Sequence, residues 1–227
     1  MVDGEGPGSE NSRVISMSLT RKLDLIDGFR KFRRKYFVLE KDLYHSLSTQ
    51  GQYPKILLIA CSDSRVDPAI LLSSEPGDLF VIRNVANLVP PYEEGGGHHG
   101  TSAAIEFAVN NLQVENIVVL GHAQCGGIAA LVANKPKEEK SFIGKWMAIA
   151  EEARLKALTK ASPENFKQFC HVCEQEAVMV SLKNLRTFPF IQKRIQDGTL
   201  TLSGWYFDLE EGKLWEYSEK AGKYLEL

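Results

Sequence analysis

Two cysteines and a histidine stand where a metal site could form. Cys61 directly follows a short apolar run, and His122 and Cys125 come after a second run, three positions apart. Thiolate and imidazole together favour zinc over magnesium or calcium, and three protein ligands leave open the position that distinguishes a catalytic from a structural zinc site. Each residue alone is more simply a packed or hydrogen-bonded side chain. Their combination predicts one catalytic zinc ion per chain.

A charged pair follows the first of these residues. Asp63 lies two positions after Cys61, close enough to accept a hydrogen bond from a zinc-bound water or to bind the zinc itself. Arg65 can form a bidentate ion pair with this carboxylate, which would keep it ionised and oriented. A salt bridge at the end of a strand is the simpler alternative. The small serines on either side of Asp63 favour a compact polar site, so we predict that Asp63 and Arg65 act together with the metal.

The apolar runs before these residues predict the strands of a parallel sheet. Residues 56–60 and 117–120 are continuously apolar, which is typical of strands buried on both faces, and residues 78–83 form a third candidate after a Pro-Gly turn. A helix is predicted over 101–112. Alternating strands and helices imply right-handed crossovers, and ligands of such sheets collect beyond the carboxyl ends of the strands. The two metal-binding segments would meet there.

The rest of the chain is predicted to add helices and a hairpin. Apolar side chains recur at three- and four-residue steps over residues 19–35, 142–158 and 163–187. Hydrophobic side chains alternate over 199–209, and a Glu-Gly turn then leads into 214–217, which predicts a C-terminal β-hairpin. The fold class that follows is α/β, with a central, mostly parallel β-sheet flanked by helices.

The composition limits the possible partners. The 227 residues are 44% hydrophobic, which is enough to fill one core, so a single domain is predicted. Residues 1–17 are predicted to form an N-terminal tail, and residues 18–227 to form this domain. With 27 basic and 29 acidic residues, neither a nucleic acid nor an anionic membrane is an expected partner. The apolar runs are far shorter than the ~20 residues of a membrane span. The tail resembles neither a secretory signal nor a transit peptide, which predicts a cytoplasmic protein.

A second cysteine pair offers a rival metal or redox motif. Cys170 and Cys173 are separated by two residues, but a structural zinc site needs four ligands and no second pair stands nearby. A redox pair of this kind begins a helix, whereas this one lies inside the predicted helix over 163–187. His98 and His99, in a glycine-rich loop, could be a surface metal pair or a proton acceptor. We predict packing for the cysteines and a polar loop for the histidines.

The two metal-binding segments resemble those of a known family. CSDSRV, followed later by GHAQCGG, is similar to the motifs of the β-class carbonic anhydrases, in particular their plant-type branch. The similarity continues through GQYPK, GDLFVIRNVANLVPPY, TSAAIEFAV and CEQEAVMVSLKNL, and it spans about residues 19–217. It implies that residues 18–227 form one catalytic domain and that residues 18–50 are an N-terminal helical arm that wraps a partner subunit. The assembly would be a homodimer, a tetramer or larger.

The resemblance also implies roles for individual side chains. Zinc would be bound by Cys61, His122 and Cys125, with Asp63 and Arg65 as the catalytic pair. The substrate pocket would be formed by Gln52, Phe80, Val85, Phe107 and the backbone of Gly126. Because the family builds this pocket across the dimer, Gln52 and Phe80 could serve the neighbouring subunit's zinc. Phe107 and Asn111 stand where the plant branch commonly has a tyrosine and a histidine, so Asn111 would be unable to relay protons.

The activity that the resemblance implies is reversible hydration of carbon dioxide to bicarbonate and a proton, by attack of a zinc-bound hydroxide. Small anions and sulfonamides would inhibit it. Two other interpretations stay open: a structural or regulatory protein without turnover, and an enzyme that hydrolyses carbonyl sulfide or carbon disulfide. The intact Asp63, Arg65 and Gln52 argue against the first, and the fold cannot separate the substrates of the second. The plant-type resemblance favours water over Asp63 as the fourth zinc ligand.

Overall fold

The computed structural model describes residues 8–95, 99–133 and 141–227, with side chains from residue 21 onward. The chain divides into two compact units, residues 1–52 and 53–227. Among the described residues, no helix combines the length and the apolar character that a membrane crossing needs. The predicted site residues lie in the second unit, with Gln52 as the exception.

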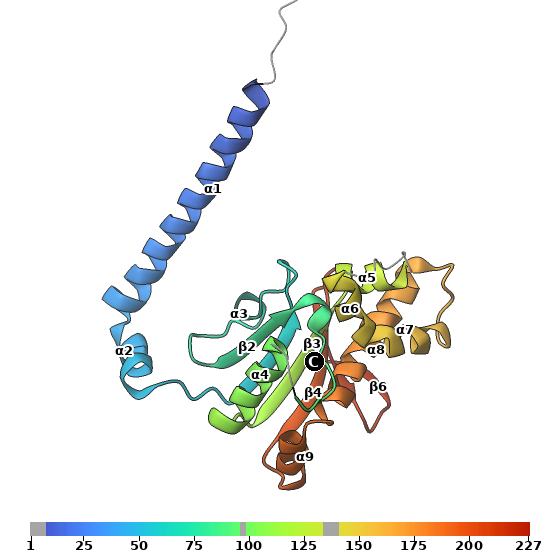
Figure 1. The fold of residues 1–227 in the computed structure, drawn as a ribbon. Coiled ribbons are helices and arrows are strands. Elements are labelled where there is room, and N and C mark those ends of the chain that lie inside the picture. Colours follow the sequence, from blue (N-terminus) through green and yellow to red (C-terminus); the bar gives the residue numbers. More distant parts are fainter. Residues whose placement is uncertain (1–7, 96–98, 134–140) are drawn as a thin grey trace, which may run out of the picture. The chain divides into compact units, whose positions relative to one another are not determined.

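The N-terminal unit consists of helices. Its elements are α1 (Gly8–Arg34), a π-helical turn (Lys35–Leu39) and α2 (Lys41–Gln50), drawn in blue in Figure 1. The helix predicted over 19–35 is the C-terminal part of a longer helix that begins at Gly8 and ends at Arg34, one residue before the predicted end.

Aromatic rings hold the bend between α1 and α2. Phe32 packs against Phe37 and Tyr44, with ring centroids 6.1 and 5.4 Å apart. Leu25 and Phe29, earlier in α1, are 76% and 60% exposed. The N-terminal unit thus has a small aromatic core at the bend and an uncovered apolar stripe along α1, which is a typical sign of a surface that another molecule covers.

A six-stranded sheet forms the centre of the second unit. Its order is β2-β1-β3-β4-β5-β6. The first four strands are parallel, β5 pairs antiparallel with β4, and β6 pairs antiparallel with β5. The strands are β1 (Ile56–Cys61), β2 (Leu79–Asn84), β3 (Asn116–His122), β4 (Thr201–Asp208), β5 (Lys213–Ser218) and β6 (Lys223–Glu226). These strands confirm the predicted fold class, the predicted parallel strands and the hairpin β4–β5. β6 adds an edge strand that the alternation pattern does not predict.

Helices surround the sheet (Figure 1). They are α3 (Pro68–Leu71), α4 (Gly100–Glu106), α5 (Gly126–Val132), α6 (Phe142–Met147), α7 (Glu151–Leu158), α8 (Phe166–Leu185) and α9 (Pro189–Gln196). The helix predicted over 101–112 is α4 continued by a π-helical turn, and the one predicted over 142–158 is α6 and α7 joined by a 3-10 turn. α8 begins later than predicted because the Asn165 side chain caps it, accepting the backbone N–H of Gln168.

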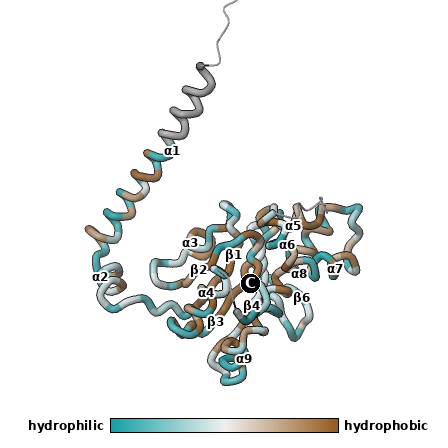
Figure 2. Tube along the Cα trace, in the orientation of Figure 1, coloured by the Kyte–Doolittle hydropathy of each residue, from teal (hydrophilic) through white to brown (hydrophobic). Residues whose placement is uncertain are grey.

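The central strands are buried on both faces, as their continuous apolar runs predict. Leu57 and Ile59 pack with residues of α4, α8 and α9, whereas Leu58 and Ala60 belong to a cluster on the opposite face; each is at most 1% exposed. β1 and β3 are among the most hydrophobic stretches of the chain (Figure 2). Because these two strands are parallel neighbours, their carboxyl ends lie at one edge of the sheet and bring Cys61 and His122 together.

Candidate metal centre

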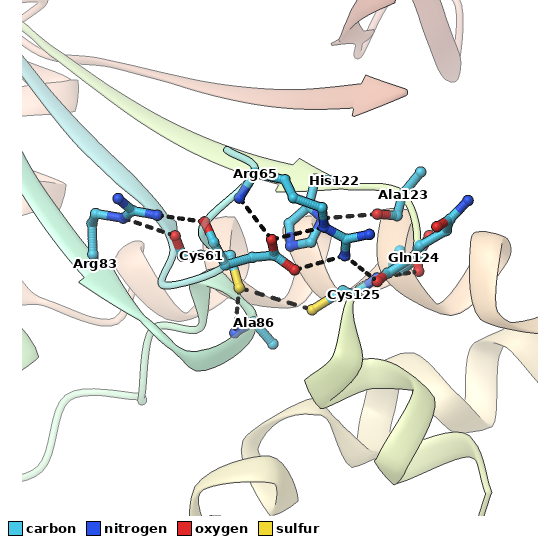
Figure 3. Close-up of polar contacts among 10 residues, drawn as sticks. Cys61, Arg65, Arg83, Ala86, His122, Ala123, Gln124 and Cys125 are labelled. Carbon is cyan, nitrogen blue, oxygen red and sulfur yellow. Dashed lines mark hydrogen bonds and ion pairs between the residues drawn. The ribbon is translucent and has the colours of Figure 1, made fainter. Parts of the chain in front are cut away.

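Three side chains converge at the carboxyl ends of β1 and β3. The sulfurs of Cys61 and Cys125 are 4.0 Å apart, and a nitrogen of His122 lies within 4.8 Å of both. Two thiolates bound to one tetrahedral zinc at ~2.3 Å would be separated by ~3.8 Å, so the observed spacing suits a shared zinc ion. Figure 3 shows the two sulfurs facing each other. Within the described part of the chain, this is the group of cysteine, histidine and acidic side chains that could share a metal.

The imidazole of His122 is prepared to act as a ligand. It is 1% exposed, and its Nδ1 lies 2.8 Å from the carbonyl oxygen of Ala123. Since a carbonyl only accepts, Nδ1 carries the proton and Nε2 presents a lone pair. This Nε2 is buried and has no hydrogen-bond partner in the protein. Such an atom costs ~1–3 kcal/mol unless something satisfies it, and a metal ion would do so.

The two thiols titrate as a pair. Their hydrogen bond lowers the pKa of Cys61 and raises that of Cys125, because one proton lies between the two sulfurs. The backbone N–H of Ala86 also donates to the sulfur of Cys61 at 3.3 Å, which stabilises a thiolate there. Ala86 has a φ of 62°, a left-handed conformation that few residues other than glycine adopt. A metal must displace the shared proton, so the affinity of the site for a metal is expected to decrease as the pH decreases.

Asp63 and Arg65 form the predicted ion pair. Nε and Nη2 of Arg65 donate to the two carboxylate oxygens at 3.0 and 2.7 Å, and the Arg65 backbone N–H donates at 2.9 Å. The side-chain hydrogen bonds hold the pKa of the Asp63 carboxyl well below its usual range. Nη2 of Arg65 also donates to the carbonyl oxygen of Gln124 at 3.1 Å. The pair is therefore tied to the loop that carries His122 and Cys125 (Figure 3).

Arg83 also supports this site, although its place in the sequence does not by itself predict a role. Its guanidinium donates to the carbonyl oxygens of Cys61 and Asp63 at 3.0 and 2.6 Å, and it pairs with Asp67 at 2.8 Å. It thereby fixes the turn that follows β1. Its position at the end of the predicted strand over 78–83 is the signal that could have identified it, because that strand ends at the same edge of the sheet.

Residues 56–214 match the family described as carbonic anhydrase. The chain belongs to the β-class carbonic anhydrases. Its relatives include a carbonic anhydrase of Synechocystis sp., 41% identical over 85% of this chain and 70% of its own length. Another is the chloroplastic β carbonic anhydrase 5 of Arabidopsis thaliana, 37% identical over 92% of this chain and 70% of its own. Membership makes this chain an enzyme of reversible carbon dioxide hydration.

Solved structures of β-carbonic anhydrases share the fold. The β-carbonic anhydrase CcaA superimposes with a TM-score of 0.82, at 37% identity over 92% of each chain. A tetrameric β-carbonic anhydrase of Sordaria macrospora gives a TM-score of 0.72, at 28% identity over 88% of this chain and 96% of that one. The Coccomyxa enzyme, solved in complex with acetazolamide, gives 0.74, at 26% identity over 85% and 84%.

The residues expected to form this carbonic anhydrase's substrate pocket are spread over several elements. Phe80 on β2 and Phe107 after α4 pack together, with ring centroids 5.8 Å apart. Val85 lines a cavity of about 590 Å³, and its carbonyl oxygen accepts the indole N–H of Trp146 at 2.7 Å. Gly126 begins α5, and a Cβ there would meet open space. Gln52 belongs to the N-terminal unit, so its role stays a prediction.

The second cysteine pair packs in the core and does not belong to the group that could share a metal. Cys170 and Cys173 are buried inside α8, and burial raises the pKa of these thiols to about 11 and about 12. Their burial confirms the prediction that they pack. His99 precedes α4 and lines the cavity next to Val85, whereas His98 lies outside the described residues.

Proposed function

We propose that this β-class carbonic anhydrase converts carbon dioxide to bicarbonate and a proton at one zinc ion held by Cys61, His122 and Cys125. The observation that carries the proposal is the buried, unpartnered Nε2 of His122 beside two sulfurs 4.0 Å apart. Zinc in such a site makes a water nucleophilic near neutral pH. Three ligands leave room for that water, and the adjacent Asp63–Arg65 pair is a feature that a purely structural zinc site would not need.

Asp63 is the group that would orient the nucleophile. Its carboxylate is 17% exposed and stays ionised because Arg65 donates to both of its oxygens. A charged acceptor fixed in this way can hold the proton of the attacking group and direct a lone pair at the carbon. The same bonds turn Asp63 toward Arg65, so they support water rather than Asp63 as the fourth zinc ligand. Arg65 acts by holding Asp63 in this orientation.

The substrate is small and apolar, and the residues proposed around it suit that character. Phe80, Val85 and Phe107 would supply apolar walls, Gln52 a hydrogen bond, and the exposed backbone of Gly126 a contact for anions. Phe107 is 44% exposed and Val85 37%, so both surfaces are available to a partner subunit or to substrate. Sulfonamides and small anions are proposed inhibitors, and the acetazolamide complex of the Coccomyxa enzyme supports the first of these.

Carbon dioxide hydration by the purified zinc-loaded protein tests this function directly. We expect stopped-flow measurements to show turnover that disappears when a chelator removes the metal, returns when zinc is added back, and is blocked by acetazolamide. Hydrolysis of carbonyl sulfide should be measured on the same sample. Full zinc content without hydration above the buffer rate would favour a regulatory protein, and faster turnover of carbonyl sulfide than of carbon dioxide would favour the other enzymatic interpretation.

We also propose that residues 18–50 are a dimerisation arm of a single catalytic domain, residues 18–227. The uncovered stripe with Leu25 and Phe29 supports this, as do the tetrameric relatives. The dimer or larger homo-oligomer would then hide the stripe. The cytoplasmic location stays a prediction, since one relative is named chloroplastic.

Deleting residues 1–35 is expected to give aggregate or inactive monomer. The surface of the partner subunit that the arm would cover is then exposed to solvent. Phe29→Glu is a milder test, since it places a charge in the proposed interface and should raise the dimer dissociation constant by at least ~10-fold, while Lys22→Glu serves as the surface control. Light scattering over a range of concentrations gives the oligomeric state. A stable, active monomer after deletion would contradict the arm.

A further inference from the structure

A buried carboxylate contacts the loop of the metal centre. Glu174 on α8 is 4% exposed, and one of its oxygens accepts the backbone N–H of Cys125 at 2.9 Å. Its other oxygen accepts the hydroxyl of Tyr206, on β4, at 2.8 Å. Among the described residues, no arginine or lysine forms an ion pair with it. Burial raises the pKa of the Glu174 carboxyl to about 7, and its hydrogen bonds to Tyr206 and to the Cys125 N–H oppose that rise.

The carboxylate is held in one orientation by a short polar chain. The Tyr206 hydroxyl lies 3.0 Å from Nδ1 of His171, and Nε2 of His171 lies 3.2 Å from the side-chain nitrogen of Gln175. Since Tyr206 donates to Glu174, it accepts from Nδ1–H of His171, whose Nε2 then accepts from Gln175. Every donor in this chain has one acceptor. Glu174 therefore acts as a hydrogen-bond acceptor whose donors are fixed by the network.

The N–H that Glu174 binds belongs to a peptide group that is held at both ends. The carbonyl oxygen of this group, from Gln124, accepts Nη2 of Arg65, while its N–H, from Cys125, donates to Glu174. The positive guanidinium thus lies at the negative end of the peptide dipole and the carboxylate at the positive end. Gln124 has a φ of 57°, a left-handed conformation that costs ~1 kcal/mol or more in a residue other than glycine. The two contacts at the ends of the peptide offset that cost.

We propose that Glu174 is a positioning residue for catalysis, which fixes the Gln124–Cys125 peptide plane and through it both the Cys125 ligand and the Arg65 partner of Asp63. Rotation of this plane would swing the Cys125 sulfur away from Cys61 and remove the acceptor that anchors Arg65. The inference rests on the proposed metal site. It adds a link between the metal ligand and the catalytic pair that runs through one peptide group.

Three variants on α8 test the role. Glu174→Met keeps the length but removes the acceptor, and Glu174→Gln keeps an acceptor oxygen. Glu176→Gln makes the matched change at another carboxylate of α8, which is 12% exposed and paired with Lys160. We expect Glu174→Met to weaken zinc affinity ~10–100-fold in chelator competition and to lower kcat with KM changed less than ~3-fold. The thiolate-to-metal absorption of its cobalt-substituted form should shift. Glu174→Gln keeps one acceptor, for the Cys125 N–H, so it should lose less zinc affinity and kcat than Glu174→Met, whereas Glu176→Gln should match the parent protein.

The outcomes separate this inference from the metal site itself. Parent protein that binds no zinc would refute the site. Parent protein that binds zinc, with Glu174→Met showing the same affinity, cobalt spectrum and kcat, would overturn only the positioning role. Thermal unfolding of the metal-free variants shows whether each folds. If Glu174→Met does not fold, Tyr206→Phe decides, because it deletes the hydroxyl that binds the second carboxylate oxygen. A shifted cobalt spectrum then supports the role, and an unchanged one overturns it.

Discussion

Cys125→Ala is expected to abolish zinc binding and carbon dioxide hydration together. The substitution removes one of two thiolates and leaves Cys61 and His122, which are too few for a stable site, since protein zinc sites use three or four ligands. Structural zinc sites reach apparent binding free energies of ~10–16 kcal/mol, so the loss of one thiolate should reduce the affinity by several orders of magnitude. The zinc content measured by metal analysis should therefore fall from about one ion per chain to nearly none, and the rate of hydration should fall to that of the buffer.

Cys173→Ala is the matched control for this change. Cys173 is also a fully buried cysteine, but it lies inside α8 and outside the metal group. Its truncation should cost ~1 kcal/mol of unfolding free energy through the small cavity it leaves, with zinc content and activity kept. Full zinc in Cys125→Ala, or loss of zinc in Cys173→Ala, would show that the ligand assignment is wrong.

Asp63→Asn is expected to keep the zinc and to lower kcat by ~10²–10³, the effect typical of removing one oriented polar group that stabilises a transition state. The amide preserves the shape but loses the charge and the strong acceptor that Arg65 holds in place. The surface change Asp197→Asn, at the end of α9, should leave kcat unaltered. Stopped-flow rates and metal content are measured on the same samples. An Asp63→Asn protein with the parent's kcat would remove Asp63 from the mechanism.

The pH dependence provides a second test of Asp63. Because Arg65 lowers the pKa of its carboxyl, Asp63 is ionised throughout the neutral range and cannot cause a change of rate there. Hydration should still rise with pH, with a midpoint at or somewhat above ~7, from the water that zinc activates. In Asp63→Asn the midpoint should stay at nearly the same pH, whereas the maximal rate reached at high pH should be lower. The rate should also depend steeply on buffer concentration, since Asn111 cannot relay protons.

Arg65→Ala tests the orientation of Asp63. Without the guanidinium, the carboxylate is free to turn to the metal, and the cobalt-substituted variant should then show a changed spectrum near pH 8. Asp63 bound to the metal in the parent protein at that pH would overturn the proposal that water is the fourth ligand.

The sequence alone predicted the central parallel strands and the group of side chains that could share a metal, because both depend on local pattern. The continuous apolar runs before Cys61 and His122 predict strands buried on both faces, and parallel strands bring their carboxyl ends to one edge whatever the distance along the chain. The pairing of Asp63 with Arg65 was also predictable, since two residues at the end of a strand can meet without help from the rest of the fold.

The tertiary structure alone decided how the metal loop is held. The Gln124–Cys125 peptide meets Arg65 and Glu174 across 59 and 49 positions of sequence. Glu174 sits within a helix whose pattern indicates packing, and no local rule distinguishes a carboxylate that binds a backbone N–H from one that faces solvent. These contacts arise only after α8 has packed against β3 and β4, because hydrogen bonds to a backbone N–H depend on the position of the whole helix and not on the spacing of side chains along it.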